Sequence, residues 1–160
     1  MCKAHCALTG VGAETDGDAI CAMLKGLRVQ WTLFAAVNKN RAEVVKVLLS
    51  KGADVNAKDA FAETALDSAV SKALPEMVAL LAKNGANVNG SGGTSPLHKA
   101  ASTGQKEIVE TLIGNKANVN ITIAFGDTPL DWANRNGKKD IAAILKKHGG
   151  KTGEELESGN

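Results

Sequence analysis

The stretch SPLHKAASTGQKEIVETLIGNKANVN, residues 95–120, contains the pattern that decides the fold of this chain. Its opening returns as TPLDWA at residues 128–133, and its close, A-x-V-N, also stands at residues 53–56 and 86–89. A repeat of this length builds a fold from similar units that stack on one another. Each unit buries its apolar face only against a neighbour, so the sequence predicts a row of stacked units.

The period is measured at the second apolar residue of each predicted second helix, at Val45, Val78, Val109 and Ala142. These residues are 33, 31 and 33 positions apart. The shorter interval lies in the connector of residues 90–94, which has lost two residues and is rich in glycine. We expect a short, flexible loop there. It is not a phosphate-binding loop, because no Lys-Ser/Thr pair follows and no strand precedes it.

Residues 95–113 predict two short helices. Ser95 stands where an N-cap belongs, and Pro96 follows at the first helical position, where its missing N–H costs nothing. Gly104 ends this helix in the left-handed conformation that glycine tolerates best, and Glu107 begins the second helix. The apolar residues of the two helices follow a helical spacing and are Leu97, Ala100, Ala101, Ile108, Val109, Leu112 and Ile113.

These residues resemble the ankyrin repeat family. The pattern T-P-L-H-x-A-A…G…E-I-V…L-L…G-A-D-V-N runs over about residues 31–149 in four units. The resemblance implies an all-α solenoid of stacked helix-turn-helix units, joined by β-hairpin fingers, that binds other proteins through its concave face. The units expected are 31–63, 64–94, 95–127 and 128–149, after an irregular segment 1–30 and before a C-terminal cap 150–160.

Composition excludes several classes of function. The net charge is +2 and aromatic residues make up 3% of the chain, so the basic stripe and stacking rings of a nucleic-acid platform are missing. No apolar run is long enough to span a bilayer or to form a signal peptide. All three cysteines lie in the first 21 residues, which leaves the repeats without a disulfide framework and suits a reducing cytosol. We expect a cytoplasmic monomer with no cofactor, no bound nucleic acid and no membrane.

The N-terminal segment has metal-capable side chains but no clear metal motif. Cys2, His5, Cys6 and Cys21 could supply four zinc ligands, but their spacing fits no recognised pair pattern. A disordered or loosely helical tail is expected instead. Residues 18–27 predict one amphipathic helix, which could form a degenerate capping half-repeat.

Several residues replace a family residue that stabilises a turn. Ala62 in a finger, Ala73 between helices and Lys116 after a second helix stand where the family has glycine, and a left-handed non-glycine residue costs about 1 kcal/mol. We therefore expect the half of the solenoid with Ala62 and Ala73 to be looser. At Ile123 the family usually has aspartate, which stabilises the hairpin turn, so this stabilisation is lost.

The bulky residues have two possible positions each. Trp31 and Phe34 are expected to pack under the N-terminal segment, with an exposed binding patch as the alternative. Trp132 is expected in the core, with the groove along the first helices as the alternative.

The two ends of the repeat array differ. Thr152-x-x-Glu155 is a capping-box pattern and predicts a short terminal helix whose Leu156 covers the last repeat. This cap argues against a cut at the C-terminus, while the atypical N-terminus leaves open that the chain is a fragment of a longer array.

His98 is the histidine inside a repeat motif, and its equivalents in the other units are Phe34, Asp67 and Asp131. No catalytic constellation therefore repeats around it. The hydroxyls of Ser102 and Thr103 lie nearby, but a Ser–His nucleophile also needs an orienting group and an oxyanion hole. The resemblance implies that His98 ties the finger to the helix by hydrogen bonds. We predict that the protein is not an enzyme.

The fingers carry the candidate binding residues. Phe61 and Phe125 occupy equivalent tips, and exposed apolar tips are unfavourable unless they are packed or used. The favoured expectation is that each ring packs against the adjacent finger. The alternative is an apolar stripe that anchors a protein partner, with the candidate residues Phe61, Glu63, Lys72, Ser102, Thr103, Ile123, Phe125, Asp127 and Arg135.

The predicted function is a non-enzymatic protein-interaction module. Its finger tips and first-helix face present the ligand surface. The alternative is a regulatory or inhibitory subunit whose cysteine-bearing N-terminus senses metal or redox state.

Overall fold

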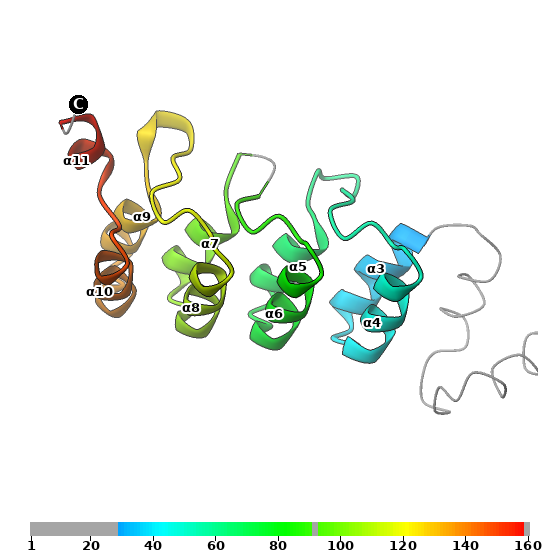
Figure 1. The fold of residues 1–160 in the computed structure, drawn as a ribbon. Helices are drawn as coiled ribbons and strands as arrows, with labels where there is room; N and C mark the ends of the chain where they lie inside the picture. The colour runs from blue at the N-terminus through cyan, green and yellow to red at the C-terminus, as the bar shows by residue number, and fades with distance from the viewer. Residues whose placement is uncertain (1–28, 91–92, 159–160) are drawn as a thin grey trace, which may run out of the picture.

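The computed structural model describes residues 29–90 and 93–158, and Figure 1 shows these as a row of helix pairs with loops projecting from one side. The predictions for the four metal-capable residues, for a helix at residues 18–27 and for the Trp31 side chain lie outside the described part. In the order of the chain, the helices are α3 Val29–Asn38, α4 Ala42–Ser50, α5 Ala65–Ser71, α6 Pro75–Lys83, α7 Pro96–Thr103, α8 Lys106–Gly114, α9 Pro129–Arg135, α10 Lys139–Lys147 and α11 Gly153–Glu157.

The helices pack as predicted for a solenoid. Each first helix packs against its own second helix, and it also packs against the first helix of the next unit. The chain is therefore an all-α stack (Figure 1). None of the helices in the described part is long and apolar enough to cross a bilayer.

The starts of the first helices α5, α7 and α9 are fixed by side-chain caps. The hydroxyls of Thr64, Ser95 and Thr128 each accept a hydrogen bond from the N–H of the residue three positions later. The predicted N-cap at Ser95, Pro96 at the first helical position and left-handed Gly104 (φ 80°) are confirmed. The next helix begins at Lys106, one residue before the predicted start.

One contiguous apolar core runs through the stack. Its second helices contribute large residues such as Leu48, Leu81, Leu112 and Leu145, all fully buried. The first helices meet one another through small residues, which let neighbouring helices approach closely. These are Ala36, Ala69, Ala100 and Ala133. Phe34 is also buried in this core, so its alternative placement in an exposed patch is wrong.

Asparagines tie the backbones of successive repeats together. Asn56 Nδ2 donates to the carbonyl oxygen of Gly85 (3.0 Å), and Asn56 Oδ1 accepts from the N–H of Asn87 (2.7 Å). The asparagine at the end of each A-x-V-N motif thus satisfies backbone groups that the helix ends leave unpaired. Bonds of the same kind join Asn89 to Asn118, and Asn120 to Gly149 and Lys151.

The fingers contain less β structure than predicted. In the described part of the chain, strand pairing is limited to an isolated antiparallel bridge between Lys58 and Thr64. Asp59 explains why the ladder stops there, because its Oδ1 accepts from the N–H groups of Phe61 (2.8 Å) and Glu63 (3.0 Å). Backbone donors that a hairpin would pair across its strands are used by a side chain within the turn.

The predicted left-handed residues are confirmed. Ala62, Ala73 and Lys116 have φ values of 60°, 54° and 67°. Asn40 (φ 53°) and Phe125 (φ 70°) also have a left-handed backbone conformation, which was not predicted.

Glycine at two of these positions is expected to stabilise the protein. Ala73→Gly and Lys116→Gly should each raise the free energy of unfolding by roughly 0.5–1 kcal/mol, because relief of the left-handed strain exceeds the added entropy of the unfolded chain. Urea denaturation measures this change. The matched control is Ala82→Gly, inside the right-handed helix α6, which should lower the free energy of unfolding by about 1 kcal/mol. Equal effects at positions 73 and 82 would contradict the strain argument.

The C-terminal helix forms as predicted, but Leu156 does not cover the core. The capping box of Thr152 and Glu155 is present at the start of α11. Leu156, however, is only half-buried and lies apart from the apolar residues packed on the core of the described chain. A five-residue helix presents too little apolar surface to dock through one leucine.

Polar contacts hold α11 in place instead. The Thr128 hydroxyl donates to the carbonyl oxygen of Lys151 (2.8 Å), and the N–H of Gly153 donates to Asp131 Oδ2 (2.8 Å). A Cβ added at Gly153 would lie 2.6 Å from the carbonyl oxygen of Gly126, so only glycine fits. The chain after α10 is thereby brought beside the last finger.

Candidate functional site

The two finger-tip phenylalanines project into solvent. The exposed fraction is 86% for Phe61 and 102% for Phe125, so the expectation that each ring packs against the adjacent finger is wrong. Each finger therefore presents a large apolar ring to water, which is unfavourable unless the ring is used.

The two tips are built by different turns. In the finger of residues 57–63, the Asp59 carboxylate binds backbone N–H groups, as described above. Ile123, at the equivalent position, has no such acceptor. Its finger keeps only the two backbone bonds that both fingers share, here from Ile123 N–H to Asp127 O (3.1 Å) and from Gly126 N–H to Ile123 O (3.0 Å). The finger without the aspartate is also the one in which the phenylalanine at the tip, Phe125, has a left-handed backbone.

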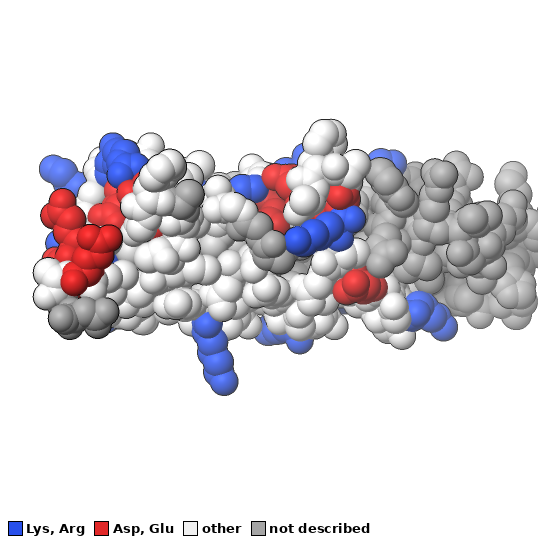
Figure 2. Space-filling model, turned by 90° about the horizontal axis from the view of Figure 1, so that it is seen from above, with Lys and Arg blue, Asp and Glu red and all other residues white. Residues whose placement is uncertain are grey.

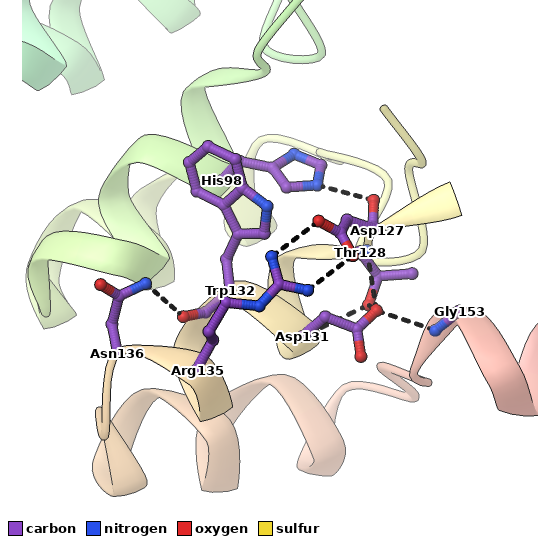
Figure 3. Close-up of polar contacts among 8 residues, drawn as sticks. All are labelled: His98, Asp127, Thr128, Asp131, Trp132, Arg135, Asn136 and Gly153. Carbon is purple, nitrogen blue, oxygen red and sulfur yellow. Dashed lines mark hydrogen bonds and ion pairs between the residues drawn. The ribbon is translucent and has the colours of Figure 1, made fainter. Parts of the chain in front are cut away.

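His98 joins α7 to the finger that precedes α9. Its ring is fully buried, with Nδ1 2.8 Å from Ser95 Oγ and Nε2 3.1 Å from the carbonyl oxygen of Asp127 (Figure 3 shows the latter bond). A carbonyl oxygen only accepts, so Nε2 carries the hydrogen and Nδ1 accepts from the Ser95 hydroxyl. The predicted structural role of His98 is confirmed.

The hydroxyls named with His98 in the sequence analysis are occupied elsewhere. Ser102 Oγ and Thr103 Oγ1 donate to the carbonyl oxygen of Lys99, one turn back in the same helix, at 2.9 and 2.8 Å. The hydroxyl that reaches the His98 ring is that of Ser95, the N-cap. These hydroxyls therefore make the hydrogen bonds that are typical of helix ends, and neither Ser102 nor Thr103 is bonded to the His98 ring.

Trp132 lies beside His98 and not in the core. The two rings meet edge to face, with centroids 5.4 Å apart (Figure 3), and the indole is half-buried. The expectation of a core position is therefore wrong, because position 132 lies on the side of α9 that faces the finger and α7. Edge-to-face contact is a favoured geometry for aromatic pairs.

Burial lowers the pKa of His98 below its ordinary value of 6.5. The hydrogen bond to the Asp127 carbonyl oxygen and the charges of Asp127 and Asp131 oppose this shift but do not cancel it. The folded protein therefore holds His98 neutral at a pH where the unfolded chain has begun to protonate it.

Stability is expected to fall on mild acidification because of His98. Between pH 6.5 and the lower folded pKa, the unfolded chain binds more protons, so the free energy of unfolding decreases as pH falls and levels off below the folded pKa. Urea denaturation between about pH 7.5 and about pH 5 measures this change. His98→Asn, which cannot titrate, should lose less stability over the same interval. An equal loss in both proteins would show that His98 does not carry the effect.

Three of the four charged candidate residues form ion pairs within the protein. Arg135 binds Asp127 through two hydrogen bonds, Nη1 to Oδ2 and Nη2 to Oδ1, both 2.9 Å (Figure 3), and it holds the pKa of Asp127 below its ordinary value. Lys99 Nζ lies 3.0 Å from Glu63 Oε1. Each pair joins a finger to a first helix, so these groups position the fingers.

The candidate residues fall into separate groups. Ile123, Phe125, Asp127 and Arg135 come together at the last finger, while Phe61 and Glu63 belong to the finger before α5. Lys72 follows the C-terminal end of α5, and Ser102 and Thr103 close α7. In the described part of the chain, no group of three or more His, Cys, Asp or Glu side chains is placed to hold a metal ion.

Comparison with protein families supports the repeat assignment. The family model described as "Ankyrin repeats" matches three overlapping stretches, residues 16–92, 32–123 and 90–155. A search of curated proteins finds no significant match.

Proposed function

Because this chain belongs to the ankyrin repeat family, we propose that it is a non-enzymatic module that binds a protein partner through its finger tips and first-helix face. Ankyrin repeats generally serve as protein–protein interaction modules. The observation that carries the proposal is the exposure of Phe61 and Phe125. Large apolar side chains that stay in solvent at equivalent tips are typical of an interaction surface.

The rigidity of the fingers supports this function. His98 ties the last finger to α7, and the Arg135–Asp127 pair ties it to α9. A surface that is already ordered loses little conformational entropy when a partner binds, so modest contacts suffice. In this proposal, the hydrogen bonds between helices and fingers hold the surface in shape, and the side chains at the finger tips contact the partner.

The test is an affinity capture from lysate with three forms of the protein. These are the native chain, the double variant Phe61→Ser/Phe125→Ser, and the control Lys46→Ser/Glu110→Ser, which changes exposed residues on the second helices α4 and α8. Circular dichroism should first show that all three are folded with similar melting temperatures.

A partner held by the native and control proteins and lost by the tip variant is the expected result. Loss of at least about tenfold in captured partner corresponds to removal of two aromatic anchors. Equal capture by the tip variant would contradict the proposed surface and direct attention to the first-helix face.

A further inference from the structure

The last finger has an acidic neighbour that the finger before α5 lacks. Helix α11 carries exposed Glu154, Glu155 and Glu157, and Glu155 is engaged in the capping box. Glu157 Oε1 lies 3.6 Å from the position that a Cβ of Gly126 would occupy, next to Phe125 in the chain. The Glu157 carboxylate thus lies against the turn that carries the exposed Phe125 ring.

Figure 2, which looks down on the fingers, shows the acidic groups gathered at the C-terminal end of the molecule and again near the finger before α5. The acidic residues at the C-terminal end include those of α11. The chain as a whole carries a net charge of +2, so this acidity is local. Each finger has one paired carboxylate, Glu63 with Lys99 and Asp127 with Arg135, so the difference between the tips comes from the glutamates of α11. The two equivalent tips thus differ in charge.

We propose that Phe125, Glu154 and Glu157 form a docking surface for a basic segment of the partner protein. This inference rests on the proposed function and specifies the chemistry of its partner. An arginine or lysine of the segment pairs with the carboxylates, and its cation or a neighbouring apolar side chain packs on the exposed ring. The bond between His98 and the Asp127 carbonyl oxygen holds the backbone of this finger against α7.

Other occupants fit this surface less well. Negative charge repels nucleic acid and anionic membranes. An added β-strand needs an open sheet edge, and the described residues offer only the isolated bridge at Lys58 and Thr64. A second copy of the chain would bring the lysines of α10, but a single ring and a five-residue helix bury far less than the roughly 1,200 Å² of a stable interface.

The experiment uses synthetic peptides as probes of the whole 160-residue chain. The first peptide carries arginine and leucine in alternating pairs, the second replaces each arginine with glutamate, and the third replaces each leucine with serine. Fluorescence anisotropy measures binding of each labelled peptide at low and at high ionic strength. The first peptide should bind at least about tenfold more tightly than either of the others, with an affinity that falls as salt is added.

The variants test whether the ring and the carboxylates at the last finger bind the peptide. Phe125→Ser and Glu154→Gln/Glu157→Gln should each weaken binding of the basic peptide by about three- to tenfold. Glu107→Gln/Glu110→Gln is the matched control, because it removes two exposed carboxylates from the second helix α8, and binding should stay within about twofold. Light scattering should show a monomer, and a dimer that Phe125→Ser dissociates would assign the surface to a second copy and overturn the inference.

The peptide experiment tests the basic-segment assignment, and the lysate capture tests the proposed function. No detectable binding of the basic peptide, equal binding of the acidic peptide, or equal loss in Glu107→Gln/Glu110→Gln would overturn the basic-segment assignment. If the lysate partner is still captured through the tips, the proposed function stands without it. If capture is insensitive to both tips, the proposed function itself fails.

Discussion

Replacing His98 with alanine is expected to lower the free energy of unfolding by about 3 kcal/mol. The change leaves the Ser95 hydroxyl and the Asp127 carbonyl oxygen without their buried partner. It also removes the edge contact with Trp132 and opens a cavity where a fully buried ring stood. The finger of residues 121–127 loses its tie to α7.

Urea denaturation of the native protein, His98→Ala and His98→Asp measures this effect. Aspartate restores a capping box like those of Thr64 with Asp67 and Thr128 with Asp131, but it is too short to replace the bond to the finger. His98→Asp should therefore fall between the native protein and the alanine variant. A loss below about 1 kcal/mol in His98→Ala would show that the finger is held mainly by other contacts.

Leu112→Ala is expected to lower the free energy of unfolding by about 3–4 kcal/mol, the typical effect of emptying a leucine site in a packed core. Leu112 is fully buried in α8, and α8 packs against both α6 and α10. In a stack of repeats each unit contacts only its neighbours, so a cavity in the third unit weakens the coupling on both sides.

The matched control is Ile113→Ala, one residue later in the same helix and only half-buried. It should lose about 1–2 kcal/mol, because less surface is returned to water. Denaturation followed by far-ultraviolet circular dichroism measures both, and a second transition in Leu112→Ala would show that the two halves of the stack unfold separately. Equal losses in the two variants would contradict the burial argument.

Local features of the fold were predictable from the sequence because they depend on a few adjacent residues. The N-cap at Ser95, the left-handed conformation of Gly104 and of Ala73, and the capping box at Thr152 all follow from side-chain and backbone chemistry within one turn. The stacking of the units follows from the period, since the A-x-V-N motif places the same apolar face at each step.

Long-range features were not predictable in the same way. Whether Phe61 packs or projects depends on what the neighbouring units place beside it, and whether Trp132 is buried depends on what α7 presents to it. The bridging role of Asn56 could have been suspected because the residue recurs in every A-x-V-N motif, but its acceptor and donor belong to the next repeat.

The sequence by itself determined the repeat architecture, the boundaries of the two helices in residues 95–113 to within a residue or two, and three of the left-handed positions. It did so because hydrophobic period, caps and glycine positions act over a single unit. Only the tertiary structure decided which side chains the stack leaves in solvent and which charges are already paired. The exposure of Phe125, the approach of Glu157 to Gly126 and the closing of Asp127 on Arg135 depend on distances between units, and a linear pattern does not contain those distances.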